Sequence, residues 1–339
     1  MLSSELPDCP AALIQPLRET LLALPSRPAR IAAAVSGGAD SAMLAVAAAH
    51  VARGQGIELQ LFHIHHGLQA QADGWAEHVQ ALGAMLGVAV MQARVQVAGD
   101  SGKGIEAAAR EARYAALARL AREQGVADVL LAHHRDDQAE TVLLRLLRGA
   151  GLQGMAAMAA ASIRDGVRYL RPWLGTGREA IRLAAVRLAD ERGWHAVDDP
   201  TNADPRYTRA AVRTRLAPVL DERWPGWQAI VARHARHMAE AAQVLDEVAE
   251  ADLQGLEPGP DRGSFSLAAW RKLSPARQTH VLRHWLAGQG AAMPSDARLA
   301  DLLRQLRQLH ALGHDRQLRV VHAGLAVRCH RGRVWVEPA

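Results

Sequence analysis

Cysteine is scarce in this chain, and its placement excludes a metal centre built from thiolates. Only Cys9 and Cys329 occur among the 339 residues; they lie near opposite ends, and no C-x-x-C spacing is present. A zinc or iron–sulfur site with cysteine ligands needs several thiolates at short spacing, so we expect neither. We do not expect a disulfide either, because the cytoplasm, where we place this chain, keeps thiols reduced.

Long hydrophobic runs are also missing. The best candidate, residues 31–52, is interrupted by Asp40 and consists mainly of small side chains, which argues against a transmembrane helix. The first ten residues, MLSSELPDCP, have neither the basic start nor the leucine-rich core of a signal peptide. We therefore expect a cytoplasmic protein without membrane contact. Its hydrophobic content of 49% is typical of a soluble globular chain, and its length suggests two domains.

Lysine is almost absent, so arginine carries the positive charge. The net charge is +5, and all but two of the 40 basic Lys and Arg residues, Lys103 and Lys272, are arginine. A basic balance favours polyanionic partners such as nucleic acid, although part of it reflects the arginine- and alanine-rich composition. The second half, where most of the excess lies, shows no RRM, KH or zinc-finger signature. No heptad pattern compels a dimer.

Strand-like and helical patterns alternate through the first half of the chain. Strands are expected at 29–35, 57–65, 88–97 and 127–134, and helices at 11–24, 40–54, 73–87, 104–125 and 136–149. This alternation predicts an α/β fold with a mostly parallel sheet and flanking helices.

The pattern changes after Gly151. We expect a basic helix over 207–217 that ends before Pro218, a long helix over 228–253, helices over 266–288 and 296–311, and strands over 316–337. The predicted domains are residues 1–217, and residues 218–339 as a helical linker with a smaller helical or α+β domain.

In the stretch IAAAVSGGADSAML (31–44), small and polar residues separate the expected buried strand from the helix that follows it. Gly37 and Gly38 allow backbone N–H groups to approach phosphate oxygens, and the following helix directs its positive end at the same anion. Ser36 and Ser41 add hydroxyl groups, whereas Asp40 suits a bound cation such as Mg²⁺. The alternative is a simple turn with Asp40 as helix N-cap. The pattern is neither Walker A nor G-x-G-x-x-G.

The S-G-G-A-D-S hexapeptide resembles the signature of the N-type ATP pyrophosphatases, the PP-loop family. Further stretches are similar to the tRNA(Ile)-lysidine synthetase family: LFHIHHGLQ (61–69), GIEAAAREARYAAL (104–117), the specific H-H-x-x-D-Q-A-E-T segment (133–141), and DDPTNADPRYTRAAVRTRLAPVL (198–220). The resemblance covers residues 30–220 and continues more weakly through 265–335, which resembles that family's substrate-binding domain.

The resemblance implies a ligase that uses ATP and Mg²⁺ and acts on the isoleucine tRNA with a CAU anticodon. ATP adenylates the C2 oxygen of the wobble cytidine, C34, and the amine of free L-lysine then displaces AMP. The products are lysidine, AMP and pyrophosphate.

The site residues expected on this basis fall into four groups. The ATP-binding residues are Ser36, Gly37, Gly38, Ala39, Asp40 and Ser41. The catalytic residues are Asp40, Arg113, His133 and Asp137, with Asp40 and Asp137 holding the metal. Asp137 and Glu140 bind lysine, and the tRNA-binding residues are Arg206, Arg209, Arg213 and Arg215. Arg209 and Arg213 share a helix face, which is costly unless an anion lies between them.

Each of these assignments has a simpler structural alternative. Asp137 can serve as a helix cap, and Glu140 can form an exposed helix pair with Arg145. Arg110 and Arg113 can lie on a solvated helix face, or contact pyrophosphate or tRNA phosphate. We expect the tryptophans at 173, 194, 224 and 227 to serve packing rather than base stacking.

Two other functions compete with the ligase. One is another PP-loop enzyme, either a tRNA thiolation enzyme, which generally needs catalytic cysteines, or a small-molecule amidotransferase. The other is a catalytically silent tRNA-binding protein that keeps the fold; the intact Ser36–Ser41 loop and Asp137 argue against such decay.

Overall fold

The computed structural model describes residues 5–65, 72–95, 105–198, 204–259, 263–309 and 317–339. The chain divides into two compact units, Met1–Met238 and Ala239–Ala339, and the division falls inside the long helix α10 (Trp227–Gln254). No helix in the described part of the chain is both long and apolar enough to cross a membrane.

The six-stranded sheet of the first unit is mostly parallel. Its strand order is β3-β2-β1-β4-β6-β5, and only the pair β5–β6 is antiparallel among the described strands. The strands are β1 (Arg30–Ala34), β2 (Glu58–His65), β3 (Ala89–Arg94), β4 (Asp128–Leu130), β5 (Ala161–Arg164) and β6 (Val167–Leu170). The order changes direction between β1 and β4, and open α/β sheets bind ligands at the carboxyl ends of such strands.

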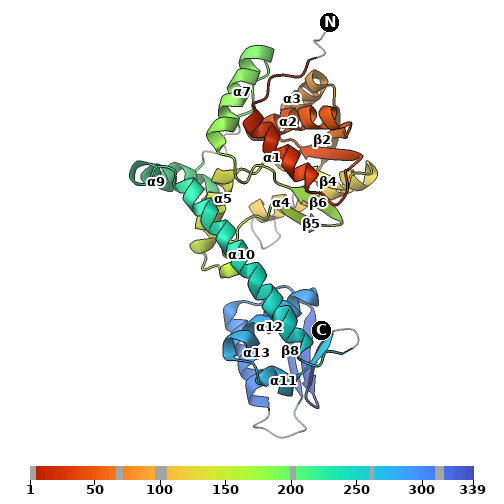
Figure 1. Cartoon of the computed structure of the whole chain (residues 1–339), viewed down its shortest axis with the longest axis vertical. Coiled ribbons are helices and arrows are strands. Elements are labelled where there is room, and N and C mark those ends of the chain that lie inside the picture. The colour runs from red at the N-terminus through yellow and green to blue at the C-terminus, as the bar shows by residue number, and fades with distance from the viewer. Residues whose placement is uncertain (1–4, 66–71, 96–104, 199–203, 260–262, 310–316) are drawn as a thin grey trace. The chain divides into compact units, whose positions relative to one another are not determined.

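Helices cover both faces of this sheet, as expected (Figure 1). One face carries α1 (Ala11–Leu22), α2 (Ala39–Gln55), α3 (Ala72–Leu86) and α7 (Arg178–Arg192), and the other carries α4 (Ile105–Glu123). Six of the seven alanines of α2 are buried, because small side chains let this helix approach the sheet and its neighbouring helices closely. The other helices of the unit are α5 (Arg135–Leu146), α6 (Leu152–Met155), α8 (Thr208–Ala211) and α9 (Ala217–Arg223).

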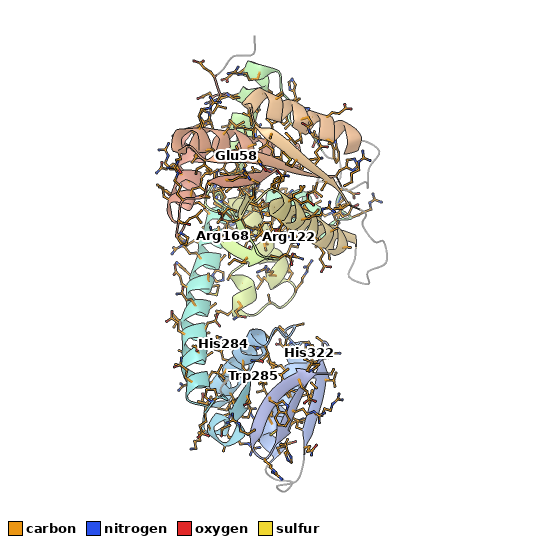
Figure 2. All side chains as sticks on the ribbon, turned by 90° about the vertical axis from the view of Figure 1, so that its right-hand side faces the viewer. Glu58, Arg122, Arg168, His284, Trp285 and His322 are labelled. Atoms are coloured by element: carbon orange, nitrogen blue, oxygen red, sulfur yellow. The ribbon has the colours of Figure 1, made fainter. Side chains whose placement is uncertain are left out.

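The second unit is a small α+β domain with its own core. Its antiparallel sheet has the order β7-β10-β9-β8, with β7 (Ser264–Ser266), β8 (Leu318–His322), β9 (Leu325–His330) and β10 (Arg333–Pro338). Its other helices are α11 (Leu267–Arg271), α12 (Pro275–Gly288) and α13 (Asp296–Gln308). Trp285 of α12, labelled in Figure 2, is buried and meets the ring of Phe265 edge-on at 4.9 Å.

The structure differs from the sequence predictions in several places. The helix expected to end before Pro218 continues through a π-helical turn (Val212–Leu216) into α9. Pro218 lies in the first turn of α9, where the N–H group that proline lacks is not required for a helical hydrogen bond. The strand expected over 127–134 ends at Leu130, so His133 and His134 lie beyond it. Strand β5 was not expected, and the helix predicted over 266–288 is two helices, α11 and α12.

Candidate active site

The loop after β1 turns the chain from strand to helix within a few residues. Gly37 has φ +95°, a left-handed conformation that favours glycine. Gly38 is the N-cap of α2, and no described side chain caps this helix end, so the N–H groups of its first turn can bind an anion. The alternative in which Asp40 caps α2 is wrong, because Asp40 lies within the first turn.

The two serines of this loop bond to each other. Ser41 is buried; its Oγ accepts a hydrogen bond from the Ser36 N–H at 3.1 Å and donates one to the Gly38 carbonyl at 3.0 Å. The Ser36 Oγ lies 3.1 Å from the Ser41 Oγ and belongs to an exposed residue. The Ser41 hydroxyl therefore shapes the loop, and the Ser36 hydroxyl is the one at the surface.

A segment after α7 holds the same loop from outside. The Val197 N–H donates to the Gly37 carbonyl at 3.0 Å, and a Cβ at Gly37 would lie 3.3 Å from Val197 Cγ2. Three residues earlier, Trp194 stacks on His78 of α3 with ring centroids 4.3 Å apart. The local sequence pattern near 197 does not indicate this role for Val197.

His134 connects the loop to the start of α5. Its Nδ1 accepts a hydrogen bond from the backbone N–H of Asp137 at 3.3 Å, and the backbone N–H of His134 donates to Asp137 Oδ2 at 3.2 Å. The two residues therefore form a capping box. The Nε2 of His134 lies 3.5 Å from both Asp40 Oδ2 and Asp137 Oδ2. The N-cap of α5 is therefore His134, and Asp137 is its capping-box partner in the first turn rather than the N-cap itself. The Asp137 carboxylate also shares one imidazole nitrogen with that of Asp40.

The charges around this imidazole shift its pKa and that of Asp137. Burial alone would lower the pKa of His134, but the hydrogen bond to Asp40 and the nearby carboxylates raise it above its usual value. Burial would raise the pKa of Asp137, but the positive charges of His134 and Arg209 lower it below its usual value. The Asp137 carboxylate is therefore ionised at neutral pH.

The donor set of Asp40 and Asp137 fits Mg²⁺ that is shared with a nucleotide. Mg²⁺ prefers oxygen ligands and is commonly held by one or two carboxylates together with substrate phosphates and water. These two carboxylates approach the same imidazole nitrogen, beside the anion-binding end of α2. Among the described residues, no group of three or more His, Cys, Asp or Glu side chains is arranged to hold a metal alone.

Glu140 is buried and paired with arginines rather than exposed beside Arg145, so that alternative is wrong. The Arg213 guanidinium donates to both oxygens of Glu140 at 2.5 and 3.0 Å and to Asp137 Oδ1 at 2.9 Å. The Arg209 Nε lies 3.4 Å from Glu140 Oε2. The anion between Arg209 and Arg213 is thus a carboxylate of the chain itself.

His133 lies among positive charges. Burial, reinforced by Arg171, Arg113 and Arg110, lowers the pKa of His133 to about 3, although Asp137 acts in the opposite direction. Its Nδ1 is buried and has no hydrogen-bond partner in the described part of the chain. His133 is therefore a neutral imidazole at physiological pH, with a ring nitrogen available to a ligand.

The remaining predicted residues lie at the surface or in the core. Arg206 and Arg215 are exposed, and Arg206 forms an ion pair with Asp204 at 2.6 Å. The tryptophans at 173, 194 and 227 are buried, which confirms a packing role, whereas Trp224 is 54% exposed. Within the quoted stretch 61–69, residues 66–69 lie outside the described part of the chain.

Two family models match the chain, one for each part of the sequence. A PP-loop domain matches residues 13–220, and a TilS substrate binding domain matches residues 265–335. A protein of Bordetella parapertussis, named tRNA(Ile)-lysidine synthase, is 68% identical over 97% of this chain and 95% of its own length. The chain belongs to the tRNA(Ile)-lysidine synthase family.

A more distant relative agrees with this membership, and a solved structure agrees with the fold. The Ralstonia nicotianae tRNA(Ile)-lysidine synthase is 47% identical over 91% of this chain and 65% of its own length. The U34-tRNA thiolase NcsA of Methanococcus maripaludis, solved with its [4Fe-4S] cluster, superposes with a TM-score of 0.55 at 16% identity. The superposition covers 67% of this chain and 78% of the thiolase chain. This likeness establishes the shared fold alone.

Proposed function

We propose that this chain is an ATP-dependent ligase that joins lysine to C2 of C34 in the isoleucine tRNA with a CAU anticodon. The observation that carries the proposal is the meeting of the Ser36–Ser41 loop with Asp137 through His134, in a chain that belongs to the lysidine synthase family. We assign ATP chemistry to residues 1–217 and tRNA binding to the linker and domain of residues 218–339 and to the exposed arginines 206 and 215. Arg209 and Arg213, which pair with Glu140, are assigned to positioning that carboxylate.

In the first step, the C2 oxygen of the cytidine attacks the α-phosphorus of ATP and pyrophosphate leaves. The loop and the N–H groups at the start of α2 bind the phosphates, and the first-turn carboxylate of Asp40 lies beside them. Asp40 and Asp137 would hold Mg²⁺, which when bound neutralises charge on the phosphates. Arg113 adds a positive charge that can face a phosphate group of the ATP or of the RNA.

In the second step, the lysine amine attacks C2 and AMP leaves. Asp137 and Glu140 are suited to hold the ammonium group, because they place two carboxylates one helical turn apart on a buried face of α5. Burial raises the pKa of Glu140 above its usual value despite its pairing with Arg213, so Glu140 is the better proton acceptor of the two. His133, which is neutral, can donate or accept a hydrogen bond to the base.

A thiolation reaction has less support in this chain. Thiolation enzymes of this class generally rely on catalytic cysteines, and both cysteines here are buried. Burial raises the pKa of the Cys9 thiol to about 12, which leaves it protonated and unreactive at neutral pH.

The proposal is tested by ATP-dependent incorporation of labelled lysine into the CAU isoleucine tRNA, with methionine tRNA as the control substrate. We expect incorporation into the isoleucine tRNA alone. Asp40→Asn should abolish incorporation and retain tRNA binding, whereas Asp190→Asn, a change at an exposed residue of α7, should retain both. Pyrophosphate release with another substrate, without lysine incorporation, would assign the chain to a different PP-loop reaction.

A further inference from the structure

Tyr114 of α4 lies at the centre of a group of arginines. The tyrosine is buried, and the guanidinium carbons of Arg164, Arg110 and Arg113 lie 4.8, 5.1 and 6.0 Å from its ring centroid. A fourth, Arg171, donates from Nη2 to the Tyr114 hydroxyl at 3.5 Å. We call Arg110, Arg113, Arg164 and Arg171, together with Tyr114, the arginine cluster.

The cluster is assembled from three separate elements. Arg110 and Arg113 come from α4, Arg164 ends β5, and Arg171 follows the carboxyl end of β6. The ring of Tyr169 in β6 meets Tyr114 edge-on at 4.9 Å and fixes the tyrosine against the sheet. Arg171 follows the carboxyl end of β6, whereas Arg164, in the antiparallel strand β5, lies opposite Val167 at the amino end of β6. The cluster therefore extends along β6 and has a rigid base in the two tyrosines.

The positive charge of this cluster is poorly balanced. In the described part of the chain, no carboxylate forms an ion pair with Arg110, Arg113 or Arg171, and Arg164 pairs only with the exposed Asp165 at 3.4 Å. Arg171 is only 6% exposed, and its Nε has no hydrogen-bond partner there. Like charges that converge without a counter-ion repel each other, so this arrangement favours an anionic ligand.

The cluster is separated from the ATP loop by the segment that carries His133 and His134. His134 is extended and directs its Nε2 at Asp40 of the loop. Neighbouring side chains of an extended chain point to opposite sides. The positive charges acting on His133 are those of Arg171, Arg113 and Arg110, and the carboxylate of Asp137 also acts on it. An anion in the cluster is thus distinct from a triphosphate on the loop.

We propose that the arginine cluster binds a phosphate group, and that the phosphate belongs to the RNA backbone beside the reacting nucleotide. Guanidinium groups bind phosphate oxygens in a fork, and several of them converging on one site suit a phosphodiester. The inference rests on the proposed function for the identity of the RNA. Released pyrophosphate has the same chemistry, and the experiment separates the two sources.

The test compares Arg110→Gln/Arg164→Gln with a control on the same helix, Arg119→Gln, whose side chain is 53% exposed and pairs with Glu123. tRNA affinity is measured at several salt concentrations, and pyrophosphate inhibition of the ATP-dependent reaction is measured beside it. For an RNA phosphate, we expect affinity to fall about 5- to 10-fold and the salt slope to fall by about 1, with pyrophosphate inhibition unchanged. A double variant with Arg164→Lys in place of Arg164→Gln should recover part of the tRNA affinity, because lysine keeps the positive charge.

The outcomes separate this inference from the proposed function. Weaker pyrophosphate inhibition with unchanged tRNA affinity keeps the phosphate site and assigns it to pyrophosphate. If the double variant matches Arg119→Gln in both measurements, the inference is overturned, even where the unaltered chain incorporates lysine. If the unaltered chain incorporates no lysine but the double variant still loses tRNA affinity, the site stands and the proposed function fails. Circular dichroism melting of each variant identifies a loss caused by unfolding.

Discussion

Two arginine–glutamate pairs in the first unit have the same forked geometry and different surroundings. Arg213 donates from Nε and Nη2 to Glu140 at 2.5 and 3.0 Å, and Arg182 donates from the same atoms to Glu179 at 2.9 and 2.8 Å. The side chains of the first pair are 22% and 6% exposed, and those of the second are 61% and 66% exposed. They form a matched test of what burial adds to such a pair.

Replacing each arginine by methionine should therefore destabilise the fold to different extents. Exposed pairs contribute about 0–1 kcal/mol, whereas removing one partner of a buried pair costs about 3–5 kcal/mol. Arg213 retains some solvent, and Arg209 stays 3.4 Å from Glu140 in the variant. We expect Arg213→Met to lower the free energy of unfolding at pH 7.5 by about 2–3 kcal/mol and Arg182→Met to change it far less.

The difference between the variants should shrink as the pH falls. Burial holds the pKa of Glu140 above its ordinary value in the folded chain. Its ionisation therefore costs stability as the pH rises from the unfolded pKa through the folded pKa. Losing Arg213 raises the folded pKa of Glu140 further and enlarges this cost. The pKa of Asp137 is lowered by neighbours that include Arg213, so its stabilisation is present above the unfolded pKa and is lost as pH falls. The Asp137 effect falls below pH 5, so the raised pKa of Glu140 is what makes the Arg213→Met penalty greater at pH 7.5 than at pH 5.

Urea denaturation of the unaltered chain and both variants at the two pH values measures these quantities, and the transition that responds belongs to the unit containing both pairs. Equal penalties for Arg213→Met and Arg182→Met would refute the argument from burial. A penalty for Arg213→Met that is the same at pH 5 and pH 7.5 would refute the assignment to buried carboxylates.

Three glycine substitutions give further tests. Gly37→Ala introduces a Cβ at φ +95° and 3.3 Å from Val197 Cγ2, so we expect the KM for ATP to rise several-fold in the lysine-incorporation assay, with a stability loss of about 1 kcal/mol. Gly83→Ala places a Cβ 2.3 Å from Val90 Cγ2 and should lower the melting temperature, with a cost of about 1–3 kcal/mol. Gly54→Ala, in α2 with no atom within 4 Å of the new Cβ, should instead stabilise by about 0.5–1 kcal/mol, as measured by the same melting experiment.

The sequence predicts well those parts of the site that are local in the chain. The break from strand to helix at Gly37 is visible because the left-handed turn needs glycine and the flanking runs are apolar. The position of Asp137 at the start of a helix is visible from the strand before it and the amphipathic pattern after it. The alternating pattern likewise predicts the mostly parallel sheet.

Contacts between distant segments are not visible in the sequence. The spacing of Arg209 and Arg213 indicates an anion, but not that the anion is Glu140, which lies 73 positions before Arg213. The weight given to His133 over His134 had the same cause, because only the fold reveals which imidazole faces Asp40. Val197 carries no chemical signature at all, since it acts through a backbone N–H and its shape.

The segment His133–His134 separates two electrostatic environments. His134 has the carboxylates of Asp40, Asp136 and Asp137 within 3.9 Å, and burial and guanidinium groups keep its neighbour His133 neutral. A ligase that joins a cationic amine to a polyanionic RNA has to bind both without letting them neutralise each other away from the reacting atoms. Two adjacent residues with a different balance of charge around them meet this requirement, because an extended backbone directs their side chains to opposite sides, although Asp137 acts on both. On this argument, the carboxylates select the cations of the reaction, the arginines select the phosphate, and the short segment between them sets their separation.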